Sequence, residues 1–154
     1  MIERIFVRLG DTAVGQYLAS STAAFATVES LHIVALAVIG GVILAANLTV
    51  VGWILRGSKA SAVIDQLRGL FLGSLVVVAL SGVLLVAAGP YKYYTNPLFP
   101  LKLLLLAMPL GIHFVLQKRL RTRRDVDTGA RVLAFGSLFL WSGVVIAGRW
   151  LGLI

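Results

Sequence analysis

The chain of 154 residues contains no cysteine, and only 13% of its residues are charged. The absence of cysteine excludes disulfides, thiolate metal sites, cysteine nucleophiles and covalently attached c-type haem. The low charge excludes a water-soluble globular fold, because the surface of such a protein needs roughly a quarter of all residues to be charged. With 59% hydrophobic residues, the sequence predicts a protein whose main solvent is the lipid bilayer.

Positive charge is concentrated in two short polar segments, residues 56–68 and 117–131. Together they hold nine of the 14 Lys and Arg residues but only three of the six Asp and Glu residues. Lys and Arg are retained on the cytoplasmic side when a membrane protein inserts, so both segments are predicted to be cytoplasmic loops. This placement explains the net charge of +8 without nucleic-acid binding, which we do not expect.

Four segments are predicted to cross the membrane, at about residues 29–55, 69–89, 97–117 and 131–151. A hydrocarbon core of ~30 Å needs about 20 apolar residues in a helix. The third segment reaches that length only if it begins after Asn96-Pro97 and if Lys102 extends to the interface. Pro109 predicts a kink in it. Four crossings with both basic loops in the cytoplasm place both termini in the periplasm, if the host is a bacterium.

Residues 1–28 are predicted to form a periplasmic amphipathic segment that lies in the interface. Apolar residues recur at helical spacing at Ile2, Ile5, Phe6 and Leu9. Glu3 and Asp11, together with the lack of an apolar core, distinguish the segment from a signal peptide, so we expect it to be retained. Ser20, Ser21 or Thr22 can cap the next helix. The predicted fold is therefore an all-α membrane protein: four transmembrane helices in an up-down bundle, preceded by an amphipathic interfacial helix.

Small and hydroxyl residues predict how the helices meet. Ala37, Gly41 and Ala45 form a stripe on the first span, and Gly69 with Gly73 forms another on the second. The Gly41 stripe lies about 180° around the helix from His32. Serines inside the spans are interpreted as interhelical hydrogen-bond partners; they are Ser74, Ser81, Ser137 and Ser142.

Polar residues inside a membrane are costly and are therefore candidates for function. Glu29 and His32 lie one helical turn apart at the periplasmic end of the first span, and Lys102 and Arg149 are predicted at the same level on the third and fourth. The segment 90–96 is predicted to be a loop and adds three tyrosines there. Four helices would thus bring a carboxylate, an imidazole and two cations to one layer.

The second histidine, His113, is predicted to lie much deeper, about 16 Å of helix beyond Lys102. One iron therefore cannot take both imidazoles of a chain, because axial nitrogens lie only about 4 Å apart. If His32 binds haem, the sixth ligand is another group, is absent, or is His32 of a second copy in a twofold dimer.

Each candidate also has a structural interpretation. His32 can be a haem or metal ligand, a proton or quinone site, or an interfacial histidine bonded to Glu29 or a tyrosine. His113 can satisfy the helical turn that Pro109 disturbs. Arg149 can pair with Glu29 or hold a haem propionate or lipid phosphate. Lys102 can be only an interface anchor.

The sequence resembles a family of small bacterial inner-membrane proteins that is labelled only as a domain of unknown function. The resemblance is carried by residues 29–33, 96–99 and 147–150, with Gly40-Gly41 and Lys102-Leu103. It implies four membrane helices with a periplasmic amphipathic N-terminus, and implicates Glu29, His32, Lys102 and Arg149. More distantly, the architecture is similar to copper-resistance D and cytochrome b561-like bundles, whose membrane histidines hold haem b or serve copper handling. The sequence departs from the family at residues 47–49 and at His113.

These observations lead to two hypotheses about function. The first is a membrane redox protein, or a subunit of a redox complex, that holds haem b or a quinone near the periplasmic face. His32 would be the ligand or hydrogen-bond partner, Glu29 its orienting group, and Lys102 and Arg149 the anion clamps. The second is a cofactor-free accessory subunit that packs on membrane partners. Copper handling ranks below both, because Met108 is the only membrane methionine. The sequence leaves open whether the protein is an enzyme.

Overall fold

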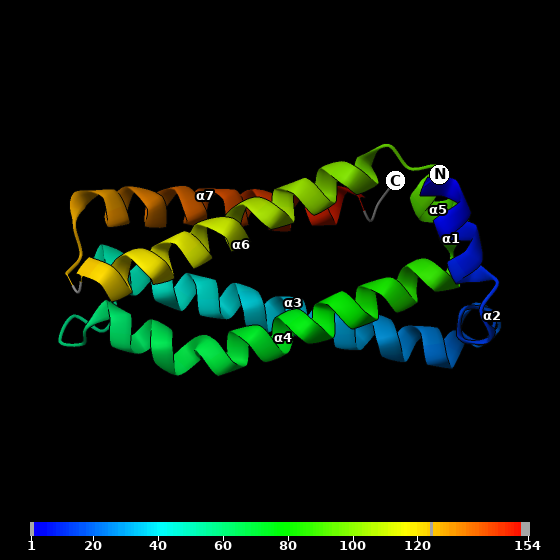
Figure 1. Ribbon diagram of the computed structural model, residues 1–154, viewed down its shortest axis with the longest axis horizontal. Helices are drawn as coiled ribbons and strands as arrows, with labels where there is room; N and C mark the ends of the chain where they lie inside the picture. The colour runs from blue at the N-terminus through cyan, green and yellow to red at the C-terminus, as the bar shows by residue number, and fades with distance from the viewer. Residues whose placement is uncertain (1, 124, 152–154) are drawn as a thin grey trace. The chain divides into compact units, whose positions relative to one another are not determined.

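The chain forms seven helices and no strand over the residues described, 2–123 and 125–151, in the computed structural model shown in Figure 1. Side chains are described for residues 3–123 and 125–146. In chain order the helices are α1 (Ile2–Gly10), α2 (Ala13–Ser20), α3 (Thr22–Val51), α4 (Ala60–Ala88), α5 (Pro90–Tyr94), α6 (Leu98–Arg123) and α7 (Thr128–Leu151). The predicted all-α class is confirmed.

Four of these helices are long and apolar enough to cross a membrane: α3, α4, α6 and α7, the last over Thr128–Ile146. The first ends at Val51 because Gly52 adopts a left-handed conformation with φ 85°, as is common just beyond a helix. In contrast, two helices extend beyond the predicted spans. The helix α4 begins nine residues before Gly69, where the second span was predicted to start, and α6 continues to Arg123, beyond the predicted end at residue 117. Long charged side chains are good helix formers, so the helices extend past their apolar stretches.

Side-chain caps mark where the helices α2 and α3 begin. The predicted amphipathic helix is α1. Ser21 caps α3, since its hydroxyl accepts a hydrogen bond from the amide of Ala24 at 3.3 Å. The extra helix α2 was not predicted; its cap is Thr12, which accepts from the amide of Gly15 at 3.1 Å. The tyrosine segment, expected as a loop, contains the short helix α5.

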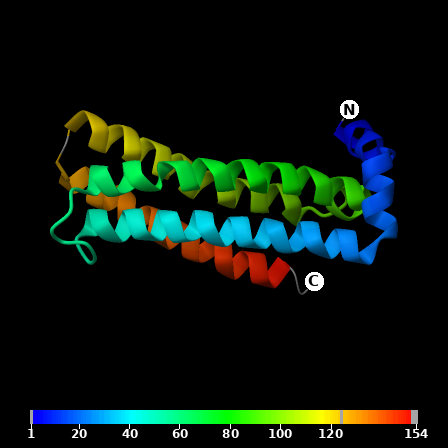
Figure 2. The same cartoon turned by 90° about the horizontal axis from the view of Figure 1, so that it is seen from below.

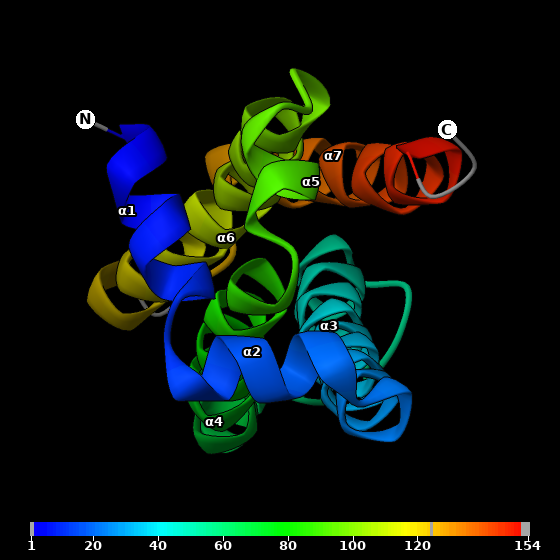
Figure 3. The ribbon, with the colours of Figure 1, turned by 90° about the vertical axis from the view of Figure 1, so that its right-hand side faces the viewer.

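The chain divides into two compact units, 1–39 with 72–99 and 40–71 with 100–154. In the first unit α1 lies beside α5, and the ring of Phe6 packs on Tyr94 and Phe99. Figure 3 shows α2 lying across the ends of α3 and α4. Gly15 permits this crossing, because a Cβ there would stand 3.0 Å from the carbonyl oxygen of Ala87.

The second unit is a four-helix bundle. Each long helix contributes two residues to its buried core: Ala46 and Val50 from α3, Ala60 and Ile64 from α4, Leu116 and Leu120 from α6, and Ala130 and Ala134 from α7. The pairs α3–α4 and α6–α7 are joined by the short connections 52–59 and 124–127, as Figure 2 shows. Short connections make successive helices antiparallel, which gives the predicted up-down order within this unit.

The glycine pair of α3 packs differently from the predicted stripe. A Cβ on Gly40 would stand 2.6 Å from Nε1 of Trp141 on α7, whereas no atom lies within 4 Å of the corresponding point on Gly41. One residue turns a helix by about 100°, so Gly40 faces the bundle and Gly41 faces away from it. The close helix approach is therefore made one residue earlier than the small-residue pattern indicated.

Candidate functional site

His32 is held against α4 in the first unit. Its Nδ1 lies 2.8 Å from the hydroxyl oxygen of Ser81, a side chain that is buried. The Ser81 hydroxyl also lies within hydrogen-bond distance of the carbonyls of Val77 and Val78 on its own helix. When it donates its single hydrogen to one of them, its oxygen accepts from Nδ1 of His32, and the imidazole proton is on Nδ1. In this tautomer Nε2 carries the lone pair, the form in which an imidazole binds a metal or accepts a proton.

The sequence of α4 explains this arrangement. A serine in an apolar helix satisfies its hydroxyl by bonding the carbonyl one turn back, which leaves the oxygen lone pairs for a neighbouring helix. The next residue, Gly82, adds no side chain: a Cβ there would stand 3.4 Å from Cε1 of His32. The imidazole thus lies over the Ser81-Gly82 step. The prediction that Ser81 makes an interhelical hydrogen bond is confirmed.

Glu29 and Tyr93 lie at the same end of the first unit as His32. Glu29 is exposed and precedes His32 by one turn of α3. Burial and, secondly, the negative charge of Glu29 raise the pKa of the Tyr93 phenol. The ring of Tyr93 packs on Phe99, with centroids 5.3 Å apart. Tyr93 therefore stays protonated, and remains a hydrogen-bond donor, over the physiological pH range.

The two predicted cations belong to the second unit. Lys102 is exposed near the start of α6. Arg149 is on α7, but its side chain lies outside the described residues. Glu29 and His32 belong to the first unit and the two cations to the second, so the gathering of these four residues into one layer stays a prediction.

His113 occupies a different environment from His32. It is 2% exposed on α6, and its ring lies against Phe71 of α4 with centroids 4.4 Å apart. Its Nδ1 has no hydrogen-bond partner. This atom therefore does not bond to a backbone group of the turn that Pro109 disturbs, as the structural interpretation of His113 expected. The helix continues through Pro109. His113 serves as an aromatic packing residue of the bundle.

A buried polar pair in the second unit was not predicted as such. The Asn47 amide nitrogen on α3 donates to the Ser137 hydroxyl on α7 at 2.8 Å, and both side chains are fully buried. The interhelical role of Ser137 is confirmed, whereas Ser142 donates within its own helix to Leu138. The sequence signal for this pair was the position of Asn47 inside an apolar run. An amide side chain is costly in such a position unless it has a hydrogen-bond partner.

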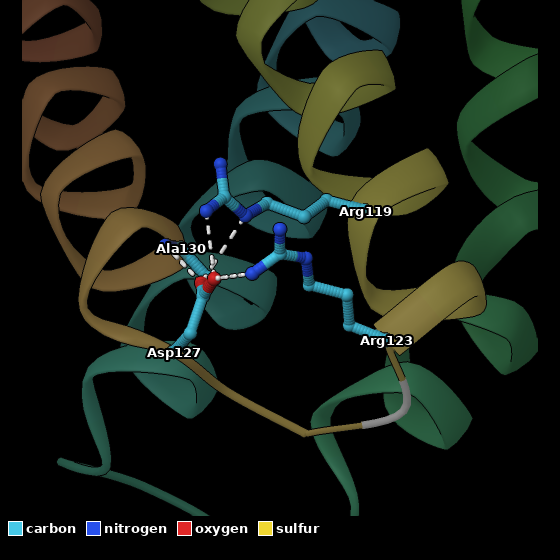
Figure 4. A network of polar contacts seen from close by, with 4 residues as sticks. All are labelled: Arg119, Arg123, Asp127 and Ala130. Atoms are coloured by element: carbon cyan, nitrogen blue, oxygen red, sulfur yellow. Dashed lines mark hydrogen bonds and ion pairs between the residues drawn. The ribbon is translucent and has the colours of Figure 1, made fainter.

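Asp127 organises the connection between α6 and α7 (Figure 4). Its carboxylate accepts from Arg119 at 2.6 Å, from Arg123 at 3.0 Å and from the amide of Ala130 at 2.8 Å. The hydrogen bonds from Arg119 and Ala130 are the main reasons why the pKa of Asp127 falls to about 2. The same carboxylate caps α7, which begins at the next residue.

A multi-residue metal centre is not formed by the described residues: they contain no group of three or more His, Asp or Glu close enough to hold one ion.

These features define a multi-pass α-helical membrane protein in which a histidine is hydrogen-bonded between two apolar helices. The chain belongs to the family of unknown function DUF6644, which matches residues 6–154. No curated protein and no solved structure matches the chain. The family resemblance is thereby confirmed, and the more distant likeness to copper-resistance and cytochrome b561-like bundles stays a prediction.

Proposed function

We propose that the protein is a bacterial membrane redox protein, or a subunit of a redox complex, in which His32 is an axial ligand of haem b. The observation that supports this best is the hydrogen bond between Nδ1 of His32 and Ser81. A metal-binding histidine almost always donates its second N–H to a fixed acceptor, which sets the tautomer and the ring orientation. Ser81 meets this requirement when its own hydrogen is donated to a carbonyl within α4.

Ser81 shares with Glu29 the proposed role of orienting the imidazole of His32. Glu29 also acts on the phenol of Tyr93 through its negative charge. Lys102 and Arg149 remain the proposed partners of the haem propionates, since both are cations. Haem b, when bound, would supply one-electron transfer. The sixth position would be filled by His32 of a second copy in a homodimer, by another group, or by none.

A quinone is the second candidate for the same place, and Tyr93 favours it. The raised pKa of Tyr93 keeps its hydroxyl as a donor for a quinone carbonyl. Nε2 of His32, in the tautomer set by Ser81, suits the other requirement, which is to accept a proton from a quinol. Glu29, exposed beside Tyr93, would pass that proton to the aqueous phase.

We further propose that the protein lies in the bacterial inner membrane with both termini in the periplasm. This orientation puts the α3–α4 and α6–α7 connections, with their excess of Lys and Arg, in the cytoplasm. His32, near the opposite end of α3, would then address the periplasmic face.

The cofactor proposal is tested by isolating the protein from membranes in a mild detergent. We expect a Soret band, and a dithionite-reduced minus oxidised spectrum of the b type. If the protein is colourless but a quinone is recovered by solvent extraction in about equal amount, the quinone alternative is correct. A preparation with neither would contradict both forms of the proposal.

The rival function is that of a cofactor-free accessory subunit. It is supported by open space at Gly41, Gly69 and Gly73, where no atom lies within 4 Å of an added Cβ. Such positions allow the backbone of another membrane helix to approach closely. This function predicts that a larger membrane protein co-purifies with the chain and that His32→Ala has little effect on that association.

A further inference from the structure

Some basic residues near the connection between α6 and α7 form ion pairs with acidic residues, and others do not. Arg119 and Arg123 pair with Asp127, and Arg121 pairs with Asp65 on α4. Arg68 and Lys118, in contrast, are exposed and take part in no ion pair within the described part of the chain. Both cations are therefore available to an external anion.

Arg68 and Lys118 also mark the edge of the apolar region. Arg68 is the last charged residue of α4 before its uncharged stretch, and Lys118 is the first charged residue of α6 after Lys102. Side chains in this position reach the level of lipid phosphates, because long basic residues extend from the hydrocarbon edge to the headgroups.

The bond between Asp65 and Arg121 fixes the register of the two helices. Nε of Arg121 donates to the Asp65 carboxylate at 2.9 Å. Arg68 follows Asp65 by three residues and Lys118 precedes Arg121 by three. Because α4 and α6 run in opposite directions in this unit, both cations lie one step of ~4.5 Å from the bonded pair, toward the contact between Phe71 and Phe114. The two cations therefore lie at about the same level, one on each helix of the seam.

The same seam has room for an apolar chain. No atom lies within 4 Å of an added Cβ on Gly111 of α6, three residues before Phe114. The ring of Phe114 is 42% exposed and packs on Phe71 of α4, with centroids 5.5 Å apart. The seam therefore has two cations at its headgroup end, and an exposed aromatic ring beside a glycine on its hydrocarbon side.

We infer that the seam between α4 and α6 binds an anionic phospholipid, with Arg68 and Lys118 on its phosphate and an acyl chain along Phe114. Adjacent like charges repel each other, and a bound phosphate would offset that repulsion. Arg offers a planar pair of donors and Lys a mobile point charge, both of which suit phosphate oxygens. This site is independent of the proposed cofactor at His32.

The inference is tested with purified protein in a non-ionic detergent, to which phosphatidylglycerol, phosphatidylcholine or inorganic phosphate is added. Thermal unfolding and native mass spectrometry report binding. We expect phosphatidylglycerol to be retained and to raise the unfolding temperature, and expect the other two additions to have little effect. An equal effect of phosphatidylcholine, or of inorganic phosphate, would contradict a site for anionic lipid.

Variants with equal charge loss locate the site. The double variant Arg68→Gln/Lys118→Gln is expected to bind phosphatidylglycerol roughly thirtyfold more weakly. The control Arg56→Gln/Lys59→Gln removes two exposed charges from the 52–59 connection and is expected to bind as the parent protein does. Equal weakening in both variants would show that only overall charge matters.

Gly111→Leu provides a second test that keeps every charge. No atom lies within 4 Å of an added Cβ at Gly111, so the variant is expected to fold. The new side chain should displace the acyl chain and reduce phosphatidylglycerol retention. Unchanged retention would overturn the placement of the lipid at this seam.

Discussion

Replacement of His32 by alanine is expected to abolish the Soret band of the purified protein. Haem b is not covalently attached and would depend on its axial ligand, and the chain contains only one other histidine. The alanine variant should still fold, because His32 is only half-buried and its partner Ser81 keeps the bond to Val77 within α4. The measurement is the absorbance per mole of protein, before and after reduction with dithionite.

His113→Phe is the matched control for the His32 variant. The ring of His113 already packs on Phe71 as an aromatic residue, and its Nδ1 is unpaired. Phenylalanine keeps the ring contact and removes a buried polar atom without a partner. We expect the Soret band to be unchanged in this variant. Loss of the band in His113→Phe with retention in His32→Ala would move the haem to the second unit.

Gly40→Leu is expected to prevent folding of the four-helix unit. Even the Cβ of the new residue would stand 2.6 Å from Nε1 of Trp141, closer than non-bonded atoms approach. Overpacking of this kind costs about 1–3 kcal/mol, and more for a large side chain. We predict loss of the monodisperse peak in size-exclusion chromatography and a strongly reduced yield from membranes. Gly40→Ala should show a smaller loss of thermal stability.

The adjacent variant Gly41→Leu separates folding from association. Gly41 faces open space, so the variant is expected to retain the fold and the unfolding temperature of the parent. If the accessory-subunit function is correct, Gly41→Leu should lose its membrane partner although it folds. Equal damage from Gly40→Leu and Gly41→Leu would contradict the packing described for α3.

The membrane helices were predictable because they depend on long-range averages of hydropathy. All four spans, the amphipathic α1 and the start of α6 after Asn96-Pro97 were found from composition and local signals. The helix ends were less accurate, because charged residues continue a helix beyond the bilayer as readily as they begin a loop. The short helices α2 and α5 carry no hydropathy signal that distinguishes them from loops.

Pairings between helices were harder to predict than the helices themselves. One interpretation of His32 gave it Glu29 or a tyrosine as a partner; the hydrogen bond to Ser81 on the next helix was not assigned to His32 from the sequence. Gly40 and Gly41 are adjacent but point about 100° apart around the helix, so only one of them can face Trp141. Small-residue motifs identify which helix can pack closely; the facing side chain decides which residue makes the contact.

The central claim is that the chain crosses the membrane four times, with the arginine-rich connections in the cytoplasm and the His32 end in the periplasm. Because the chain has no cysteine, single cysteines at two exposed lysines, Lys59→Cys and Lys92→Cys, test it directly with a membrane-impermeant maleimide on intact spheroplasts. We predict that Lys92→Cys is labelled at once and Lys59→Cys only after lysis. The reverse pattern, or labelling of both before lysis, would contradict this topology and with it a periplasmic cofactor site at His32.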